Sequence, residues 1–153
     1  MSTPSERLAA LGLELPVVHP PVAKYVPALR HGDLVFASGQ TPTVDGKLTV
    51  TGKLGAGVTV EDGQQAARLC ALNCLAAAAQ TAGGLDSISQ VVKLTGYVAS
   101  AEGFTEQPAV INGASQLLEE VFGDAGKHVR AALGLAELPG GAPVEIELIV
   151  AVR

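Results

Sequence analysis

The sequence contains no tryptophan, and aromatic residues make up only 3% of its 153 residues. Proteins that bind single-stranded nucleic acid stack the bases on aromatic side chains, so this composition argues against that class. The formal net charge is −5, and the ten lysines and arginines are scattered along the chain. This charge argues against a general phosphate-binding surface.

Cysteine is also scarce, with Cys70 and Cys74 alone in the sequence. They lie four residues apart in a stretch rich in alanine and leucine, which predicts that both thiols share one helix face. We expect two buried free thiols, because the three histidines show no metal-ligand spacing relative to them. No metal or organic cofactor is predicted, and the lack of a disulfide framework suits a reducing compartment.

Long hydrophobic runs are missing as well. No stretch reaches the roughly 18 apolar residues that a membrane span needs, and residues 1–15 lack the pattern of a signal peptide. We therefore expect a soluble, cytoplasmic protein. With 48% hydrophobic residues, the chain can form one domain over residues 1–153. Within it we distinguish an N-terminal helix and extended arm (1–22) from a core (23–153).

Helix signals occur at three places. Thr3, followed by Pro4 and Glu6, predicts a short helix that ends near Gly12. A long helix is expected from Thr59 to Gly83-Gly84, and a further helix within 102–123 has Pro108 in its first turn.

Strand signals flank these helices. Two strands should meet at a turn over 31–33, and Asp45-Gly46 predicts a hairpin. Further strands are expected within 89–100, 127–138 and 143–152. The resulting order predicts an α+β fold, a sheet with both main helices packed on one face. The other face also carries apolar residues, so we expect an oligomer to cover it.

Arg130 is the first candidate functional residue, because it interrupts an otherwise apolar run, "HVRAALGLAELP", that resembles a buried strand. A charge removed from water needs a partner, which is either a carboxylate of this chain or a ligand. A guanidinium can hold a carboxylate with two hydrogen bonds, so an organic acid is a suitable ligand.

Glu145 is the second candidate. A turn over 139–141 should fold its strand back beside the strand of Arg130, so Glu145 either neutralises Arg130 or orients a water molecule. Glu147 shares the same strand face and competes for either role. Weaker candidates are Tyr25, the turn "SGQTP" (38–42) and Asn112.

Three segments together resemble the Rid family, also called YjgF/YER057c/UK114. They are "ASGQTP", "HVRAALGLAELP" and the terminal "VEIELIVAVR". The similarity covers roughly residue 23 to the C-terminus. The resemblance implies a chorismate-mutase-like α+β fold with a mixed sheet, and a homotrimer with ligand clefts between subunits. It also implies hydrolysis of reactive enamines and imines, such as 2-aminoacrylate, to a 2-keto acid and ammonia.

The resemblance further assigns roles to residues. The arginine matching Arg130 binds the substrate carboxylate, and the glutamate matching Glu145 holds the attacking water with a backbone carbonyl of the strand at Ala132. Family positions for a tyrosine, the turn serine and glycine, and a helix asparagine match Tyr25, Ser38, Gly39 and Asn112, respectively. The residue at position 132 is often cysteine in the deaminating members, so only the backbone of Ala132 serves here.

Two other functions stay open on the sequence. A non-catalytic protein that binds small carboxylates or keto acids would use Arg130 and leave Glu145 dispensable. An endoribonuclease that inhibits translation is the other alternative, since some family members are described in this way. The acidic, aromatic-poor composition argues against RNA as the ligand.

Overall fold

The structure is a computed structural model that describes residues 2–153. Within these residues, five strands form the main sheet, in the order β1-β2-β9-β7-β8. Strands β7 and β8 are parallel and the other neighbours are antiparallel, so the predicted mixed α+β sheet is confirmed. The strands are β1 (Ala28–His31), β2 (Leu34–Gln40), β7 (Ile88–Ala99), β8 (Val129–Leu135) and β9 (Val144–Val152).

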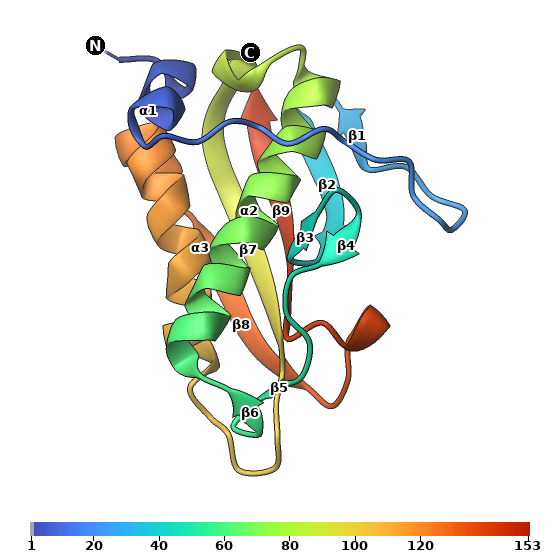
Figure 1. Ribbon diagram of the computed structural model, residues 1–153. Coiled ribbons are helices and arrows are strands. Elements are labelled where there is room, and N and C mark those ends of the chain that lie inside the picture. Colours follow the sequence, from blue (N-terminus) through green and yellow to red (C-terminus); the bar gives the residue numbers. More distant parts are fainter. Residues whose placement is uncertain (1) are drawn as a thin grey trace.

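Two long helices cover one face of this sheet, as predicted (Figure 1). They are α2 (Val60–Ala82) and α3 (Gln107–Phe122), and a short helix α1 (Pro4–Ala10) packs on α3. Short strand pairs lie outside the sheet: β3 (Thr43–Val44) with β4 (Lys47–Leu48), and β5 (Lys53–Leu54) with β6 (Gly57–Val58). Turns of 3₁₀ helix span Leu85–Ser87, Gly123–Gly126 and Pro139–Gly141.

The helix ends follow the sequence signals. The Thr59 hydroxyl accepts a hydrogen bond from the backbone N–H of Asp62 at 3.1 Å, and Gly83 closes α2 with φ of +91°. Thr3 and Glu6 form the predicted capping box of α1. This helix ends at Ala10, slightly before the predicted end near Gly12.

Strand β9 has the predicted alternation. Every second residue from Val144 to Val152 is buried, while Glu145 and Glu147 face the opposite side of the sheet. Cys70 and Cys74 of α2 are free and buried against this strand, as expected, and Cys74 Sγ donates to the Ile146 carbonyl at 2.9 Å. Burial raises the pKa of both thiols, so they remain protonated and inert.

The neighbour predicted for β9 is wrong. Strand β9 lies between β2 and β7, and β7 separates it from β8. The reason is that α3 forms a crossover between two parallel strands, which places β8 directly beside β7. Residues 136–143 then carry the chain to the other side of β7, where the fully alternating β9 is covered by helices on its apolar face.

The expected burial of β8 is also wrong within one chain. This strand forms an edge of the sheet, and Val129 and Leu133 are 66% and 47% exposed. Leu29 and Phe36, at the opposite edge, are 60% and 41% exposed on the same face. The face of the sheet away from the helices is therefore open and partly apolar.

The N-terminal segment packs against the rest of the domain through α1. Leu8 is buried in the core, and the backbone N–H of Ser5 donates to Asp86 Oδ1 at 2.8 Å. The division at residue 22 stays a prediction. In residues 2–153, no helix combines the length and apolar character that a membrane crossing requires.

Candidate functional site

Arg130 lies on the helix-covered side of the sheet. It pairs with Leu94 of β7, and paired residues of neighbouring strands share a face, so its side chain lies beside α3. Its guanidinium donates from Nη1 to Ser115 Oγ at 3.1 Å and from Nη2 to the Pro108 carbonyl at 3.3 Å. Both acceptors are neutral, which leaves the positive charge of Arg130 uncompensated by these contacts.

Within the described residues, no carboxylate forms an ion pair with Arg130. Among residues 2–153, no aspartate or glutamate lies within 4.0 Å of the guanidinium of Arg130, and its residue is exposed. Of the two partners expected from the sequence, an internal acid is thus absent in the part of the chain that the structure describes. The guanidinium remains accessible to an external anion.

Asn112 lies on the same side of α3 as the two acceptors of Arg130. Pro108, Asn112 and Ser115 are spaced by four and three residues, a spacing that aligns side chains along one helix face. Ala132 follows Arg130 by two residues on β8 and therefore shares its strand face. The structure thus groups three predicted residues, which we call the arginine cluster: Arg130, Asn112 and Ala132.

Sequence reasoning missed two residues that hold Arg130 in place. His128 Nδ1 donates to the Gly126 carbonyl at 2.6 Å, because a carbonyl oxygen can only accept. The Ser115 hydroxyl lies 2.9 Å from His128 Nε2, and its oxygen also accepts from Arg130. The spacing of His128 and Arg130, two residues apart at the start of a strand, is the signal that predicts a shared face.

The other predicted residues surround a separate cavity, which we call the glutamate cleft. It has a volume of about 300 Å³, and Tyr25, Gly39 and Glu145 line it together with Thr41 and Pro139. A Cβ atom at Gly39 would lie 2.9 Å from Glu145 Cδ, so a side chain there would displace the carboxylate. The bulge of β2 between Ala37 and Gln40 brings this glycine against Glu145.

Glu145 and Glu147 have different environments, although they share a strand face. Glu147 accepts a hydrogen bond from the Tyr97 hydroxyl, which raises the pKa of Tyr97 to about 12. Among the described residues, no side chain hydrogen-bonds to Glu145, and its pKa is raised by burial and then by the charge of Glu147. Glu145 is therefore the carboxylate of this pair that no described side chain engages by a hydrogen bond.

Ser38 lies outside the lining of the glutamate cleft. Its hydroxyl donates to the Val26 carbonyl at 2.7 Å, and its backbone N–H donates to the Pro27 carbonyl at 2.8 Å. These bonds tie the segment that carries Tyr25 to β2. Tyr25 is 50% exposed.

The arginine cluster and the glutamate cleft do not meet within one chain. Arg130 lies on the helix side of the sheet and Glu145 on the open side. Strand β7 separates their strands, a spacing of roughly 10 Å across the sheet. Of the two roles left open for Glu145, neutralising Arg130 inside one chain is thus excluded. Among residues 2–153, no group of three or more histidine, cysteine, aspartate or glutamate side chains is placed to hold a metal ion.

Comparison with known proteins defines the family to which this chain belongs. Residues 5–142 match the family model described as "YjgF/chorismate_mutase-like, putative endoribonuclease". The chain therefore belongs to the YjgF/chorismate-mutase-like family, and its mixed sheet with helices on one face is the fold of that family. The resemblance found in the three sequence segments is confirmed.

Individual relatives agree with this assignment. Protein TCP17 of Trypanosoma cruzi is 44% identical over 144 residues, which are 94% of this chain and 90% of that protein. The solved structure of Atu1372 from Agrobacterium tumefaciens, described as of unknown function, is 46% identical, with a TM-score of 0.88 over 98% of this chain and 92% of that chain. A more distant structure, E. coli TdcF with bound serine, is 27% identical, with a TM-score of 0.64 over 88% of this chain and 91% of that chain.

Proposed function

We propose that this protein hydrolyses reactive 2-imino and enamine acids, such as 2-aminoacrylate, to 2-keto acids and ammonia. The observation that carries the proposal is the guanidinium of Arg130, which is held in place by neutral acceptors and has no internal carboxylate among the described residues. A positioned, uncompensated guanidinium is suited to a ligand carboxylate. The bound serine of the relative TdcF, an amino acid with a carboxylate, supports a ligand of this class.

The proposed site is shared between two copies of the chain. Because Arg130 and Glu145 lie on opposite sides of one sheet, they act together only if the edge strand β8 of one copy approaches the glutamate cleft of another. The open, partly apolar sheet face gives the reason for association, since burying it removes that surface from water. We propose a homotrimer with three such clefts between subunits.

The proposed reaction needs no covalent nucleophile. Arg130 holds the substrate carboxylate, while Glu145 accepts a proton from water as the water oxygen adds to the C=N carbon. That proton passes to the imine nitrogen, which gives a carbinolamine. A second proton then moves from the carbinolamine hydroxyl through Glu145 to the nitrogen as the C=O bond forms and the C–N bond breaks, so ammonia and a keto acid leave. The raised pKa of Glu145 favours both steps, because a carboxyl group that titrates closer to neutral pH can both take up and return a proton.

The remaining predicted residues have supporting roles in this proposal. Asn112 lies beside Arg130 and contacts the ligand, and the Ala132 backbone carbonyl helps to orient the water. Tyr25 and Gly39 form the wall of the cleft next to Glu145, and Ser38 fixes the segment of Tyr25.

The test is the release of ammonia from 2-aminoacrylate that is generated in solution, measured with the purified protein and its Arg130→Ala variant. We expect the variant to lose the acceleration and to keep its oligomeric mass. Arg30→Ala, which removes another exposed arginine from an edge strand, is the matched control and should retain activity. Equal turnover by the Arg130→Ala variant would refute the proposal.

Two alternatives are separated by further measurements. If the protein only binds carboxylates, Glu145→Gln leaves binding of 2-ketobutyrate intact and the protein has no turnover to lose. The family description also names endoribonuclease activity. RNA cleavage that co-purifies with the protein and disappears in the Arg130→Ala variant would favour that function.

A further inference from the structure

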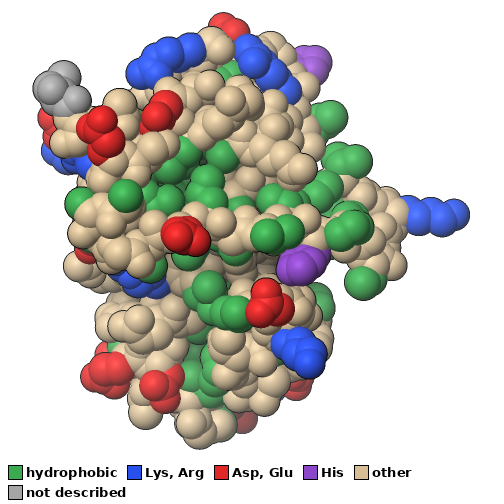
Figure 2. Space-filling view, turned by 45° about the horizontal axis from the view of Figure 1, so that its top comes forward, with side chains coloured by type: hydrophobic (Ala, Val, Ile, Leu, Met, Phe, Trp, Pro, Cys, Tyr) green, Lys and Arg blue, Asp and Glu red, His purple; other side chains and the backbone are tan. Residues whose placement is uncertain are grey.

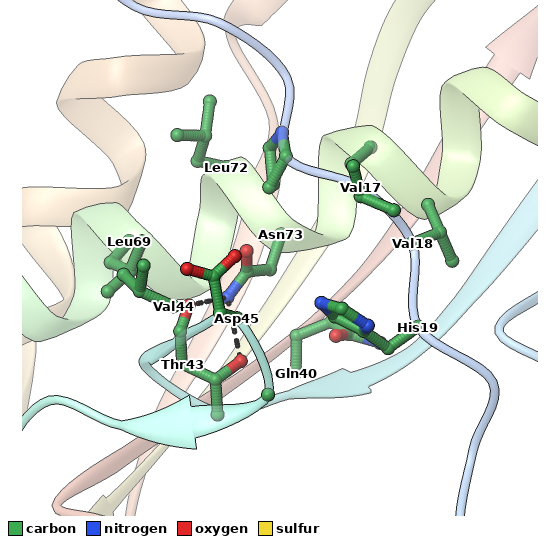
Figure 3. A pocket seen from close by; sticks show the side chains of 13 residues that line it. Val17, Val18, His19, Gln40, Thr43, Val44, Asp45, Leu69, Leu72 and Asn73 are labelled. Carbon is green, nitrogen blue, oxygen red and sulfur yellow. Dashed lines mark hydrogen bonds between the residues drawn. The ribbon is translucent and has the colours of Figure 1, made fainter.

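A second cavity lies between α2 and the N-terminal arm, away from Arg130 and Glu145. We call it the arm pocket; its volume is about 270 Å³, and it is drawn in Figure 3. The arm passes over α2 in Figure 1, and Val17 of the arm forms one side of the pocket. Leu69, Leu72 and Asn73 of α2 form the floor, and Asp45 of the turn between β3 and β4 forms the rim.

Asn73 presents a hydrogen-bond acceptor to the arm pocket. This residue is only 8% exposed, and its Nδ2 donates to the carbonyls of Thr41 and Thr43, each at 3.1 Å. Figure 3 draws its bonding to Thr43. These bonds fix the amide so that Oδ1 faces away from both threonines. Among the described residues, no group donates to this oxygen and no buried side-chain oxygen lacks a partner, so Oδ1 is open to the pocket, where a ligand can donate to it.

The charge of the arm pocket also favours a donor. Asp45 and Gly46 have φ of +52° and +78°, the turn conformation that joins the tight hairpin and holds the Asp45 carboxylate at the rim. None of the thirteen described residues drawn in Figure 3 is a lysine or an arginine. The whole chain, with a net charge of −5, adds to the attraction for a cation.

The rest of the wall is apolar. Val17 is 79% exposed, and Figure 2 shows hydrophobic side chains gathered across the middle of the face that it draws. Leu69 and Leu72 are half-buried beneath the arm. The volume corresponds to about nine water molecules of liquid, which is enough for a branched alkyl chain with one polar head.

We infer that the arm pocket binds a small primary amine with an apolar tail. The ammonium group donates to Asn73 Oδ1 and faces the Asp45 carboxylate, and the tail packs against Val17, Leu69 and Leu72. This site is independent of the proposed deaminase reaction, because it uses neither Arg130 nor Glu145. A carboxylate ligand is disfavoured here by the charge of Asp45.

Three probes of one carbon skeleton test the inference: 3-methylbutylamine, 3-methylbutan-1-ol and 3-methylbutanoate. Each is titrated into the intact protein at pH 8, where the amine is charged, while methyl NMR signals of Val17, Leu69 and Leu72 are followed. We expect saturable shifts with the amine, binding at least fivefold weaker with the alcohol, and no shifts with the carboxylate. No shift with the amine, or equal binding of amine and carboxylate, would overturn the inference.

Variants locate the binding. Asp45→Asn keeps a residue that suits the turn. It should weaken binding of the amine at least fivefold and leave binding of the alcohol unchanged. Glu102→Gln removes one exposed charge outside the pocket and should change neither the affinity for the amine nor the affinity for the alcohol. Equal weakening by both variants would mean non-specific attraction and would contradict the site. Arg130→Ala should leave amine binding unchanged, so this result is separable from the fate of the proposed deaminase.

Discussion

The guanidinium of Arg130 is oriented by hydrogen bonds to neighbouring residues. Its guanidinium is oriented by a serine that is itself hydrogen-bonded to a histidine, and the histidine donates to the carbonyl of Gly126. The two acceptors of Arg130, the Ser115 hydroxyl and the Pro108 carbonyl, are neutral, so orientation is achieved without cancelling the charge. This arrangement suits a side chain that meets an anion from outside.

Ser115 is a positioning residue in this account. Ser115→Ala removes the acceptor for Nη1 and should raise KM for the imino acid about fivefold, with kcat within a factor of two, because the loss of one charge-assisted hydrogen bond at an exposed site is modest. Ser115→Thr keeps the hydroxyl and should restore KM. Steady-state kinetics of the parent protein and the Ser115→Ala and Ser115→Thr variants test this role. A fall in kcat at unchanged KM would contradict it.

Glu145 should reduce stability at neutral pH. Its pKa in the folded chain is raised above the ordinary value of 4.5 by burial and by Glu147. Below the ordinary pKa, Glu145 is protonated in both the folded and the unfolded chain and does not change the free energy of unfolding. Above the raised pKa, the folded chain holds a half-buried carboxylate, which lowers the free energy of unfolding.

Glu145→Gln should therefore raise the melting temperature by a few degrees at pH 8, and the difference should shrink as the pH falls toward 4. Thermal unfolding followed by circular dichroism across this range measures it, with Glu102→Gln as the control for an exposed acid. A variant that is less stable than the parent at pH 8 would show that the carboxylate is stabilised by a partner.

Sequence reasoning found Arg130 because a lone cation in an apolar strand is conspicuous. It did not find Ser115 and His128, because one lies on a helix and the other beside a strand, thirteen residues apart. Only the packing of α3 on β8 brings them together. Glu145 and Glu147 could not be told apart from the sequence either, since the partner of Glu147 is Tyr97 of another strand.

At the scale of elements, α3 has to pack closely on α2 to present its face to Arg130. Gly113 allows this approach, since a Cβ atom there would lie 2.8 Å from the backbone carbonyl carbon of Gln64. The side chain of Gln64 also donates to the Ala109 carbonyl at 2.9 Å. The two helices are therefore in backbone contact at the level of Asn112 and Ser115.

Gly113→Ala should force the helices apart. We expect the free energy of unfolding to fall by about 1–2 kcal/mol, because overpacking outweighs the roughly 1 kcal/mol that alanine contributes as a better helix former. Urea unfolding measures this, and Gln116→Ala, an exposed substitution on the same helix, should have little effect. A more stable Gly113→Ala variant would mean that the helices do not need this contact.

The elements themselves were largely predictable, but their neighbours were not. Thr59, Gly83 and the alternation of β9 are local signals, and each gives the observed boundary or face. Strand order depends on how α3 crosses the sheet and on where residues 136–143 return, and neither is encoded in a local pattern. For this reason the predicted pairing of the last two strands was wrong.

At the scale of the whole molecule, one chain carries two incomplete halves of the proposed site. The arginine cluster lies at the β8 edge on the helix side, and the glutamate cleft lies beside β2 and β9. The exposed apolar residues of the open face, including Phe36 and Leu133, give a reason for copies to associate. Association would complete each half with the other half of a neighbouring copy.

The most direct test of this composite site mixes two inactive variants. Arg130→Ala and Glu145→Gln are unfolded together and refolded, or expressed in one cell, so that subunits of both kinds share an oligomer. If each site takes Arg130 from one copy and Glu145 from its neighbour, about one site in four should be intact and the mixture should regain that fraction of ammonia release. A mixture that forms mixed oligomers but stays inactive would contradict the account.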